Sequence, residues 1–428
     1  MTWEIPPEER SYLRTLAGKQ AAYAALPVMA RRKKMWYDLN EGRAGARPPV
    51  IVETWTFDRD FLPADVFRCK SGDGRRIETR LLRNIRNHEL IDDDKVMPDY
   101  FSIGWFCDIN EMGVKVESDT IPDSQGVNTG YHYRHPIQDL ARDIELLKPA
   151  VCTVDREKTF AYQAFLRELF GGKLDVRIET GTFGVSMLTE RVVELMGMEA
   201  FFLAMYDTPD LVHRLMGFLR DNCLRMMRWA ESEQLLRVNN GNQMSFGSSY
   251  NFTTELGASL DHNTPAKLKD MWGACNSQET VGIAPDMYHE FCFPYYRDVA
   301  EPVGLLYYGC CEPAHPFWDD IQRYPHLKKV SVNRWTDEEF IGERLRGTKI
   351  VFSRKPDPNL LGVDVELRED VWRAHIRKTL QAARDVPVEF LCRDVYTVHG
   401  NLGKARRAVE LAREEIDLAG RGSAIASS

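Results

Sequence analysis

The sequence predicts an α/β fold in which eight parallel strands, each followed by a helix, close into a (β/α)₈ barrel. From about residue 150 onward, short apolar segments alternate with amphipathic helical segments, which is the pattern of parallel βαβ units. The chain has 428 residues, 43% of them hydrophobic, enough for a core of that size. A doubly wound open sheet is the alternative, but no glycine-rich phosphate loop follows any predicted strand.

The N-terminal part is predicted to be a helical extension over residues 1–48. Pro6 and Pro7 open a helix there, and Gly42 with the Gly- and Pro-rich stretch 45–49 ends the helical pattern. The first strand follows at 50–54, where the barrel domain, predicted over 49–419, begins.

The next segment, about 57–149, interrupts the strand–helix pattern. It contains short strand-like stretches separated by Asp, Gly and Pro turns, so we expect an inserted β/loop region over the barrel mouth. Residues 420–428 are small and polar, and we expect a disordered tail.

The remaining elements alternate along the chain. Strands are expected at 175–180, 236–239, 268–274, 303–308, 328–333, 348–353 and 387–392. Helices are expected at 193–205, 209–229, 287–299, 336–346, 371–383 and 404–418. With the strand at 50–54 the strand count is that of a closed barrel.

Composition excludes several classes of protein. A net charge of −8 disfavours a nucleic-acid-binding protein, and no apolar run reaches the roughly 20 residues that a membrane span needs. The first residues lack the basic and apolar regions of a signal peptide, and nine cysteines fit a reducing compartment. We expect a cytoplasmic protein, and the sequence is compatible with a homodimer.

Candidate binding residues follow from the barrel geometry, because the strand C-termini and the loops after them form the active face. The predicted substrate-binding residues are Glu53, Trp272, Gln278, Asn333, Arg334, Trp335, Arg354, Lys355 and Asp394. Two cations at one strand end suit an anionic group, although Arg354 and Lys355 could equally form a solvated rim. The aromatic side chains suit a flat or cationic ligand, or they only pack the barrel.

Two thiols are adjacent after a predicted strand, at Cys310 and Cys311, and Cys392 ends another strand. Zinc in catalytic sites takes three protein ligands from Cys, His, Asp or Glu and leaves one position open. The sequence therefore predicts a zinc site of Cys310, Cys311 and Cys392. The alternative is that the adjacent thiols are merely buried.

Glu279, Tyr308 and Glu312 are the predicted catalytic residues of this mouth. Glu279 taken alone has a simpler interpretation as an exposed or N-capping acid. Glu312 and Glu279 are also candidates for a third zinc ligand.

The stretches 181–184, 198–213 and 284–291 resemble the uroporphyrinogen decarboxylase superfamily, and the resemblance covers residues 175–415. The motifs at 308–313, 330–335 and 353–356 are similar to a branch of that superfamily close to the corrinoid-dependent (methylcobamide) methyltransferases. The resemblance implies a TIM barrel and methyl transfer between a small O-, N- or S-methylated substrate and a corrinoid protein, as in a demethylase.

The resemblance also implies site chemistry. Cys310 and Cys392 match two zinc-ligand positions of the methyltransferases, whereas Tyr308 stands where those enzymes have histidine. Zinc would act as a Lewis acid on the heteroatom that loses the methyl group. The chain has no Asp-x-His-x-x-Gly cobalamin motif, so a separate partner protein would carry the corrinoid.

Two other functions remain open at this point. A decarboxylase or other lyase would hold a carboxylated substrate through Arg334, Arg354 and Lys355, but residues 27–33 lack the arginine-rich motif of uroporphyrinogen decarboxylases. A non-catalytic binding protein with a degenerate site is the third class. Metal content separates methyl transfer from both.

Overall fold

A parallel sheet forms the centre of the computed structural model, which describes residues 3–122, 128–181, 183–184, 187–246, 248–257 and 259–426. Seven strands lie in the order β1-β15-β14-β13-β12-β11-β8, and every neighbouring pair is parallel. Their bounds are β1 (Val50–Val52), β8 (Phe183–Gly184), β11 (Trp272–Cys275), β12 (Leu305–Tyr308), β13 (Leu327–Val332), β14 (Val351–Arg354) and β15 (Val388–Cys392). The predicted α/β class with parallel strands is confirmed.

A second parallel pair joins β2 (Tyr100–Ile103) to β7 (Asp175–Ile178). Strand β2 lies within the segment 57–149, so part of the predicted insertion contributes a strand to the parallel framework. The strand expected at 236–239 is wrong, because this segment is irregular in the structure. The Asn239 side chain there bonds to the backbone of Trp272, with its Oδ1 accepting from the N–H at 2.8 Å. Among the described residues, the hydrogen-bonded strands do not form one closed sheet.

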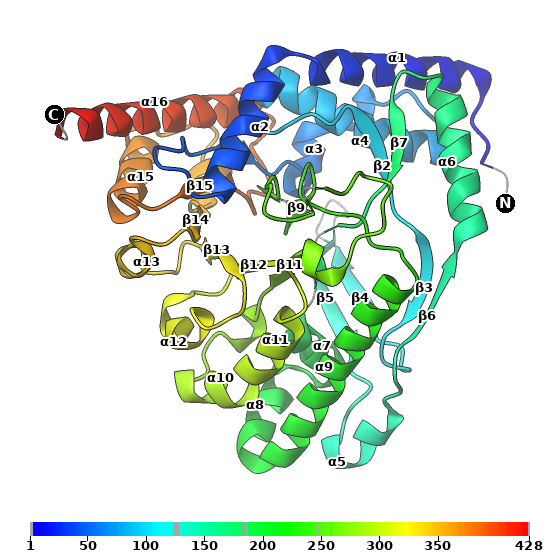
Figure 1. Ribbon diagram of the computed structural model, residues 1–428, viewed down its shortest axis with the longest axis vertical. Coiled ribbons are helices and arrows are strands. Elements are labelled where there is room, and N and C mark those ends of the chain that lie inside the picture. Colours follow the sequence, from blue (N-terminus) through cyan, green and yellow to red (C-terminus); the bar gives the residue numbers. More distant parts are fainter. Residues whose placement is uncertain are drawn as a thin grey trace.

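Helices cover the strands and frame the molecule (Figure 1). The longer ones are α1 (Pro7–Ala24), α2 (Pro27–Asn40), α4 (Gly72–Arg86), α6 (Arg156–Phe170), α7 (Leu188–Met196), α8 (Met198–Asp207), α9 (Pro209–Ser232), α10 (Pro285–Phe291), α11 (Phe293–Ala300), α13 (Glu338–Leu345), α15 (Glu369–Ala382) and α16 (Leu402–Ala426). The short ones are α3 (Asp58–Phe61), α5 (Leu140–Asp143), α12 (Trp318–Ile321) and α14 (Asn359–Gly362). The predicted N-terminal helices are confirmed. Helix α16 continues into the predicted disordered tail as far as Ala426, and residues 427–428 lie outside the described part.

Three antiparallel ribbons complete the fold. They pair β3 (Phe106–Asn110) with β6 (Val151–Asp155), β4 (Glu117–Pro122) with β5 (Asn128–Arg134), and β9 (Met244–Ser245) with β10 (Ser249–Tyr250). Strands β3, β4 and β5 lie within the predicted β/loop region at about 57–149, and β6 lies just after it. No helix in the described part of the chain combines the length and apolarity needed to cross a bilayer.

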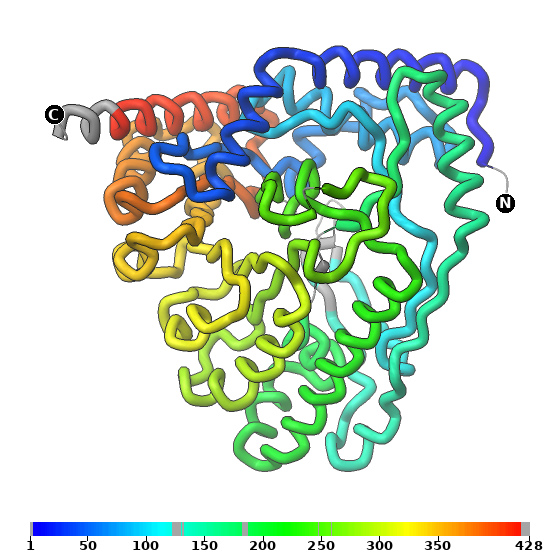
Figure 2. Tube along the Cα trace, viewed as in Figure 1, coloured from blue at the N-terminus to red at the C-terminus, as the bar shows by residue number. Residues whose placement is uncertain are grey.

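The strands alternate their side chains between two faces, as a pleated backbone requires. In β15, Val388, Phe390 and Cys392 join the main hydrophobic core, while Glu389 and Leu391 point to the opposite face. Helix α2 closes part of that opposite face, since Trp36 packs with Val351 and Leu391. The trace in Figure 2 shows this N-terminal helix beside the C-terminal strands and α16.

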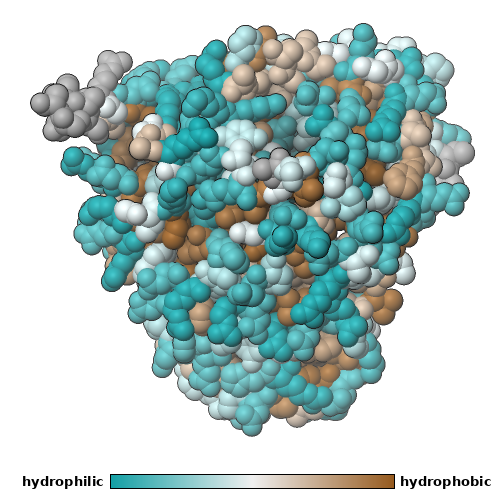
Figure 3. All heavy atoms as spheres, viewed as in Figure 1, coloured by the Kyte–Doolittle hydropathy of each residue, from teal (hydrophilic) through white to brown (hydrophobic). Residues whose placement is uncertain are grey.

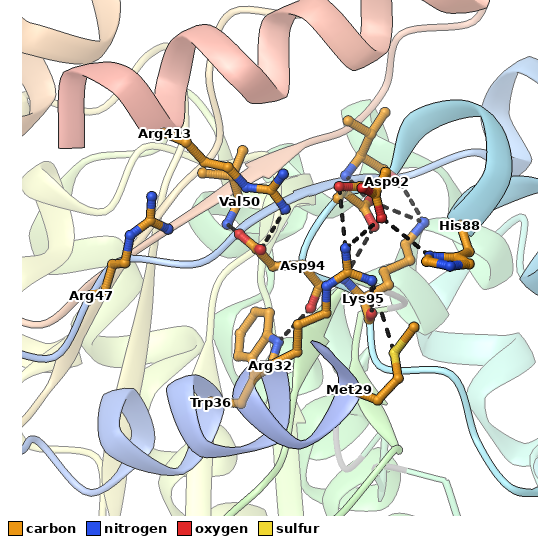
Figure 4. A network of polar contacts seen from close by, with 12 residues as sticks. Met29, Arg32, Trp36, Arg47, Val50, His88, Asp92, Asp94, Lys95 and Arg413 are labelled. Atoms are coloured by element: carbon orange, nitrogen blue, oxygen red, sulfur yellow. Dashed lines mark hydrogen bonds and ion pairs between the residues drawn. The ribbon is translucent and has the colours of Figure 1, made fainter. Parts of the chain in front are cut away.

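Among the described strands, none pairs with the outer edge of β1, and an acidic turn covers this edge (Figure 4). The Val50 N–H donates to the Asp94 carboxylate at 2.8 Å, and the Asp94 N–H donates to the Val50 carbonyl at 2.9 Å. Arg413 from α16 pairs with Asp94 at 2.6 Å, and Arg32 from α2 pairs with Asp92 at 2.7 Å. Side chains therefore replace a neighbouring strand along this edge.

The face of the molecule in Figure 3 is mainly hydrophilic, with smaller apolar areas between the polar ones. Large apolar side chains that are exposed include several that follow strand ends. These are Trp55 after β1, Val281 after β11, Trp335 after β13 and Tyr396 after β15.

Candidate functional site

Polar and thiol side chains gather where the parallel strands end. Cys310 and Cys311 follow β12, Lys355 follows β14, Arg393 follows β15, and Glu53 follows β1. Parallel strands all end on one side of their sheet, which brings these five residues of distant sequence together. These residues form the candidate site described below.

Cys310 is fixed by hydrogen bonds to its backbone. Its N–H donates to the Glu312 carboxylate at 2.9 Å, and its carbonyl accepts from the Ser331 hydroxyl at 2.9 Å and from Lys355 Nζ at 2.7 Å. Its side chain is nearly buried, while that of Cys311 is exposed. The two Sγ atoms are 3.6 Å apart.

The surroundings of Cys310 favour a thiolate. Hydrogen bonding from the Cys311 thiol lowers the pKa of Cys310; burial opposes this, and the cations of Lys355 and Arg393 reinforce it. The same hydrogen bond raises the pKa of Cys311, and burial adds to the rise. The two thiols therefore differ in acidity, and Cys310 is the one that loses its proton more readily.

Arg393 and Glu53 form a buried pair beside the thiols. Arg393 Nε lies 3.6 Å from Glu53 Oε2. Burial raises the pKa of Glu53, and the Arg393 charge acts against that rise. Neither carboxylate oxygen of Glu53 makes a hydrogen bond of normal geometry among the described residues, although the Asp394 N–H lies near enough to lower the pKa of Glu53. This acid–base pair keeps unused hydrogen-bonding capacity at the strand ends.

Two further carboxyl groups border Cys310. The Glu279 carboxylate accepts from the Thr189 hydroxyl at 2.7 Å, and burial raises the pKa of Glu279. Burial, the nearby Glu279 charge and the Cys310 charge also raise the pKa of Glu190. Raised pKa values keep carboxyl groups available as proton donors near neutral pH. Gln278 lies half-buried beside Glu279.

Glu312 holds the loops rather than facing a ligand. Its two carboxylate oxygens accept from the N–H groups of Ser277 and Cys310, each at 2.9 Å. Asn333 donates to the Glu312 carbonyl at 2.8 Å and accepts from Trp335 N–H at 2.9 Å. The loops after β11, β12 and β13 are thereby tied together. Glu312, predicted as catalytic, and Asn333, predicted as substrate-binding, therefore hold these loops in position through their hydrogen bonds.

Three other predicted residues lie away from the site. Tyr308 points to the helix-covered face, where its hydroxyl contacts those of Ser277 at 2.9 Å and Tyr288 at 3.1 Å. Arg354 is buried on the same face and pairs with Glu338 at 2.9 Å. Trp272 is fully buried and donates to the Asn251 carbonyl at 3.0 Å. Strand alternation, which the sequence interpretation did not apply, explains Tyr308 and Arg354.

The remaining predicted residues are on the rim. Arg334 pairs with Asp357 at 2.9 Å and stacks over Trp335, which is 64% exposed. Asp394 accepts from the Cys311 thiol at 3.9 Å and lies 3.5 Å from Arg393 Nε. Asp394 therefore borders the thiol pair, whereas Arg334 and Trp335 do not contact it in any described interaction.

The residues do not fit the predicted zinc site. Cys392 shares the outward face of β15 with Phe390 and is 2% exposed, so its thiol lies in the apolar core. Burial raises the pKa of Cys392 to about 12. Across the described ranges, no three His, Cys, Asp or Glu side chains converge as metal ligands. Of the predicted ligands Cys310, Cys311 and Cys392, the structure brings only the first two together.

Sequence reasoning missed Arg393 and Glu190. Arg393 directly follows Cys392, the last residue of β15. Because side chains alternate along a strand, Arg393 is expected on the opposite face from Cys392, which is the face of the site. Glu190 lies in the first turn of α7 and carries no pattern that separates it from other helix-start acids.

A cavity of about 110 Å³ adjoins Glu53, and neither Cys310 nor Cys311 lines it. It is lined by Thr54 and Trp55 after β1 and by Arg83 and Lys95. Burial lowers the pKa of Lys95, and Asp93 and Glu53 oppose that effect. The cavity provides room for a small molecule next to the strand ends.

Comparison with known proteins gives structural likeness but no match in sequence. No family model matches the chain, and no curated protein matches it. Among solved structures, the chain is similar to a methyltransferase from Methanosarcina mazei, at 14% identity and a TM-score of 0.49, with 90% of this chain and 98% of that chain covered.

Proposed function

We propose that the parallel strands belong to a (β/α)₈ barrel. Residues 175–184 run from β7, which pairs with β2, to β8, which pairs with β11, so one segment joins both sets of strands. Beside β1, where the eighth strand would adjoin it, the carboxylates of Asp94 and Asp93 accept from the N–H groups of Val50 and Val52. The eight strands would be β1, β2, β7, β11, β12, β13, β14 and β15.

We propose further that the protein is a methyltransferase that moves a methyl group from a small O-, N- or S-methylated substrate to a corrinoid on a partner protein. The observation that carries this proposal is the grouping of the Cys310 thiol with two buried cations at the strand ends. Lys355 Nζ bonds to the Cys310 carbonyl at 2.7 Å, and Arg393 follows the end of β15. The motif resemblance over residues 175–415 supports methyl transfer as the chemistry. The nine free cysteines support a reducing compartment such as the cytoplasm.

In this function each group of the site has a task. Lys355 and Arg393 bind the polar end of the substrate, and the Cys310 thiolate fixes both cations. When the methyl group leaves, the substrate heteroatom keeps the electron pair of the broken bond and needs a proton. The Glu279 carboxyl group, with its raised pKa, is the donor on this side of the site. The corrinoid supplies the acceptor for the methyl group.

A decarboxylase or lyase is the second candidate, and one observation favours it. Lys355 and Arg393 are both buried cations at the site, as a bound carboxylate requires. They replace Arg334 and Arg354 in that interpretation, since these two already pair with Asp357 and Glu338.

The deciding experiment mixes the purified protein with free reduced cobalamin and a panel of methylated substrates. Appearance of the methylcobalamin absorption spectrum supports methyl transfer. Cys310→Ser should reduce the rate about 100-fold or more, as loss of one key charged group in a site does. Cys392→Ser is the matched control and should react at the wild-type rate, because its thiol lies in the core. Release of CO₂ from carboxylated substrates without any methylcobalamin would establish the lyase function instead.

A further inference from the structure

Cys310 and Cys311 are adjacent in the chain, and their two thiols lie in contact. Their Sγ atoms are 3.6 Å apart, and the pair lies at the end of a strand with Cys311 exposed. The other buried cysteines, such as Cys275 and Cys292, lie in the apolar core. Only at Cys310 and Cys311 do two described thiols approach each other with one open to solvent.

The backbone prepares the two thiols for different roles. Cys310 is clamped through its N–H by Glu312 and through its carbonyl by Ser331 and Lys355. Within the described part of the chain, the hydrogen bonds of Cys311 involve only its thiol. This thiol contacts Cys310 Sγ, and it donates to Asp394 at 3.9 Å. Cys310 is thus a fixed nucleophile, and Cys311 is free to rotate toward it.

We propose that Cys310 and Cys311 are a site of reversible oxidation, in which a peroxide converts the two thiols into a disulfide between adjacent residues. The Cys310 sulfur attacks one peroxide oxygen, the O–O bond breaks, and the departing oxygen leaves as water after taking up a proton. Cys310 is then a sulfenic acid. The Cys311 sulfur attacks the Cys310 sulfur, the S–O bond breaks, and a second water leaves. Two thiols and one hydrogen peroxide give one disulfide and two waters.

Lys355 and Arg393 assist the first step. Lys355 Nζ is bonded to the Cys310 carbonyl, and the Arg393 guanidinium lies between Glu53 and Asp394 at the same strand ends. Cations beside a cysteine stabilise the thiolate that attacks a peroxide. They also stabilise the negative charge that develops on the departing oxygen.

The disulfide would be easily reduced, because adjacent residues are too close for a relaxed one. Consecutive Cα atoms are about 3.8 Å apart, whereas disulfides prefer Cα separations of about 4.4–6.8 Å. Strained, exposed disulfides have oxidising potentials and are the labile ones. Oxidation would remove the thiolate from Lys355 and Arg393, so the site would lose its negative partner until a thiol restored it.

The chain offers a matched control in Cys107 and Cys152. They lie on the paired strands β3 and β6, where Cys107 is opposite Val154 and Cys152 is opposite Ile109. Cys107 is exposed and Cys152 is half-buried, so both are accessible to an oxidant. Arg156 acts on Cys107 and Arg225 acts on Cys152, but the pair lacks the thiol–thiol contact that joins Cys310 to Cys311.

The experiment treats the full chain with hydrogen peroxide, blocks remaining thiols, and maps disulfides by mass spectrometry before and after a dithiol reductant. We expect the peptide with both adjacent cysteines to lose two hydrogen atoms, and the reductant to restore it. Cys311→Ser should instead accumulate sulfenic acid at Cys310, trapped by a dione probe, and Cys107→Ser should behave as wild type. A folded Cys311→Ser chain without this adduct, or a wild-type chain in which Cys107 and Cys152 oxidise first, would overturn the proposal. These readouts do not depend on methyl transfer.

Discussion

Two buried acid–base pairs occupy the same face of the parallel sheet and differ in how completely they are hydrogen-bonded. Lys329 and Glu389 are 3.4 Å apart and fully buried in the middle of the sheet. Lys329 Nζ also donates to Ser249 Oγ at 2.6 Å, and Glu389 accepts from Ser353 Oγ at 2.6 Å. Glu53 and Arg393 at the strand ends are 3.6 Å apart without such a set of bonds.

The difference separates a structural pair from a functional one. A buried pair with all its hydrogen bonds made stabilises one arrangement of the chain and has no capacity left for a ligand. A buried pair with unused capacity costs free energy in the folded chain and regains it when a ligand or water supplies the missing bonds. Each prediction below tests this distinction.

The largest effect is expected from Lys329→Met. Removing the cation leaves the Glu389 carboxylate buried without its partner, so the free energy of unfolding should fall by about 3–5 kcal/mol. Denaturant unfolding measures this loss. The double variant Lys329→Met with Glu389→Leu should recover most of it, since both charges are gone. A loss below about 1 kcal/mol in the single variant would contradict the structural role of the pair.

Thiol reactivity at pH 6 compares the strand end with the core. The ordinary thiol pKa is about 8.5, so an unperturbed thiol is almost fully protonated at this pH. The lowered pKa of Cys310 keeps its thiolate present, whereas burial raises the pKa of Cys392 to about 12. Iodoacetamide should modify Cys310 about 100-fold faster than Cys392. Mass spectrometry of samples taken over time measures the two rates. Equal rates in the folded protein would show that Cys310 is an ordinary buried thiol.

Gly309→Ala tests the backbone that presents Cys310. Gly309 has a φ of +94°, and a Cβ there would lie 2.9 Å from Ser331 Cβ. We expect a loss of about 1–3 kcal/mol in the free energy of unfolding, because the residue is strained and crowded. Gly347→Ala is the control, since it has a φ of +79° with no atom within 4 Å of the added Cβ. If both variants lose the same amount, crowding against Ser331 plays no part.

The smallest effect is expected from Glu53→Gln. The free energy of unfolding should change by less than about 1 kcal/mol at pH 7, because the cost of burying the Glu53 charge and its attraction to Arg393 nearly cancel. The folded pKa of Glu53 is raised above its ordinary 4.5. The folded chain thus binds this proton more tightly than the unfolded chain does, and the stability it contributes falls as the pH rises above about 4.5. Unfolding at pH 4 and pH 7 should show a steeper decline in wild type than in Glu53→Gln. An equal decline would place the titration elsewhere.

Much of the fold could be predicted because it depends on local pattern. The strands at 303–308, 328–333, 348–353 and 387–392 were each located within a few residues, since short apolar runs between helices are typical of buried parallel strands. Strand β2 was missed as a framework element because its neighbours are loops rich in Asp, Gly and Pro. Residues 236–239 are irregular rather than a strand, and the Asn239 side chain bonds to the backbone of Trp272 there.

The candidate site was predicted in position but only partly in membership. The rule that parallel strands end on one side selected Glu53, Cys310, Cys311, Lys355 and Asp394, all of which lie there. Three other predicted residues also end strands: Tyr308, Arg354 and Cys392. Because side chains alternate between the two faces of a strand, these three point to the helix-covered face. Arg393 is not among the predicted site residues, although strand alternation places its side chain on the same face as the thiols.

The sequence by itself determined the α/β class, the helical N-terminus and the side of the sheet that carries chemistry, because periodicity and strand direction are properties of adjacent residues. Only the tertiary structure decided which side chains meet. The face that each strand turns outward depends on register and on the helices packed against it, and these involve residues far apart in the chain. The same dependence makes Lys329 a partner of Glu389, and it leaves Arg393 beside Glu53 and Cys310 with bonds still to make.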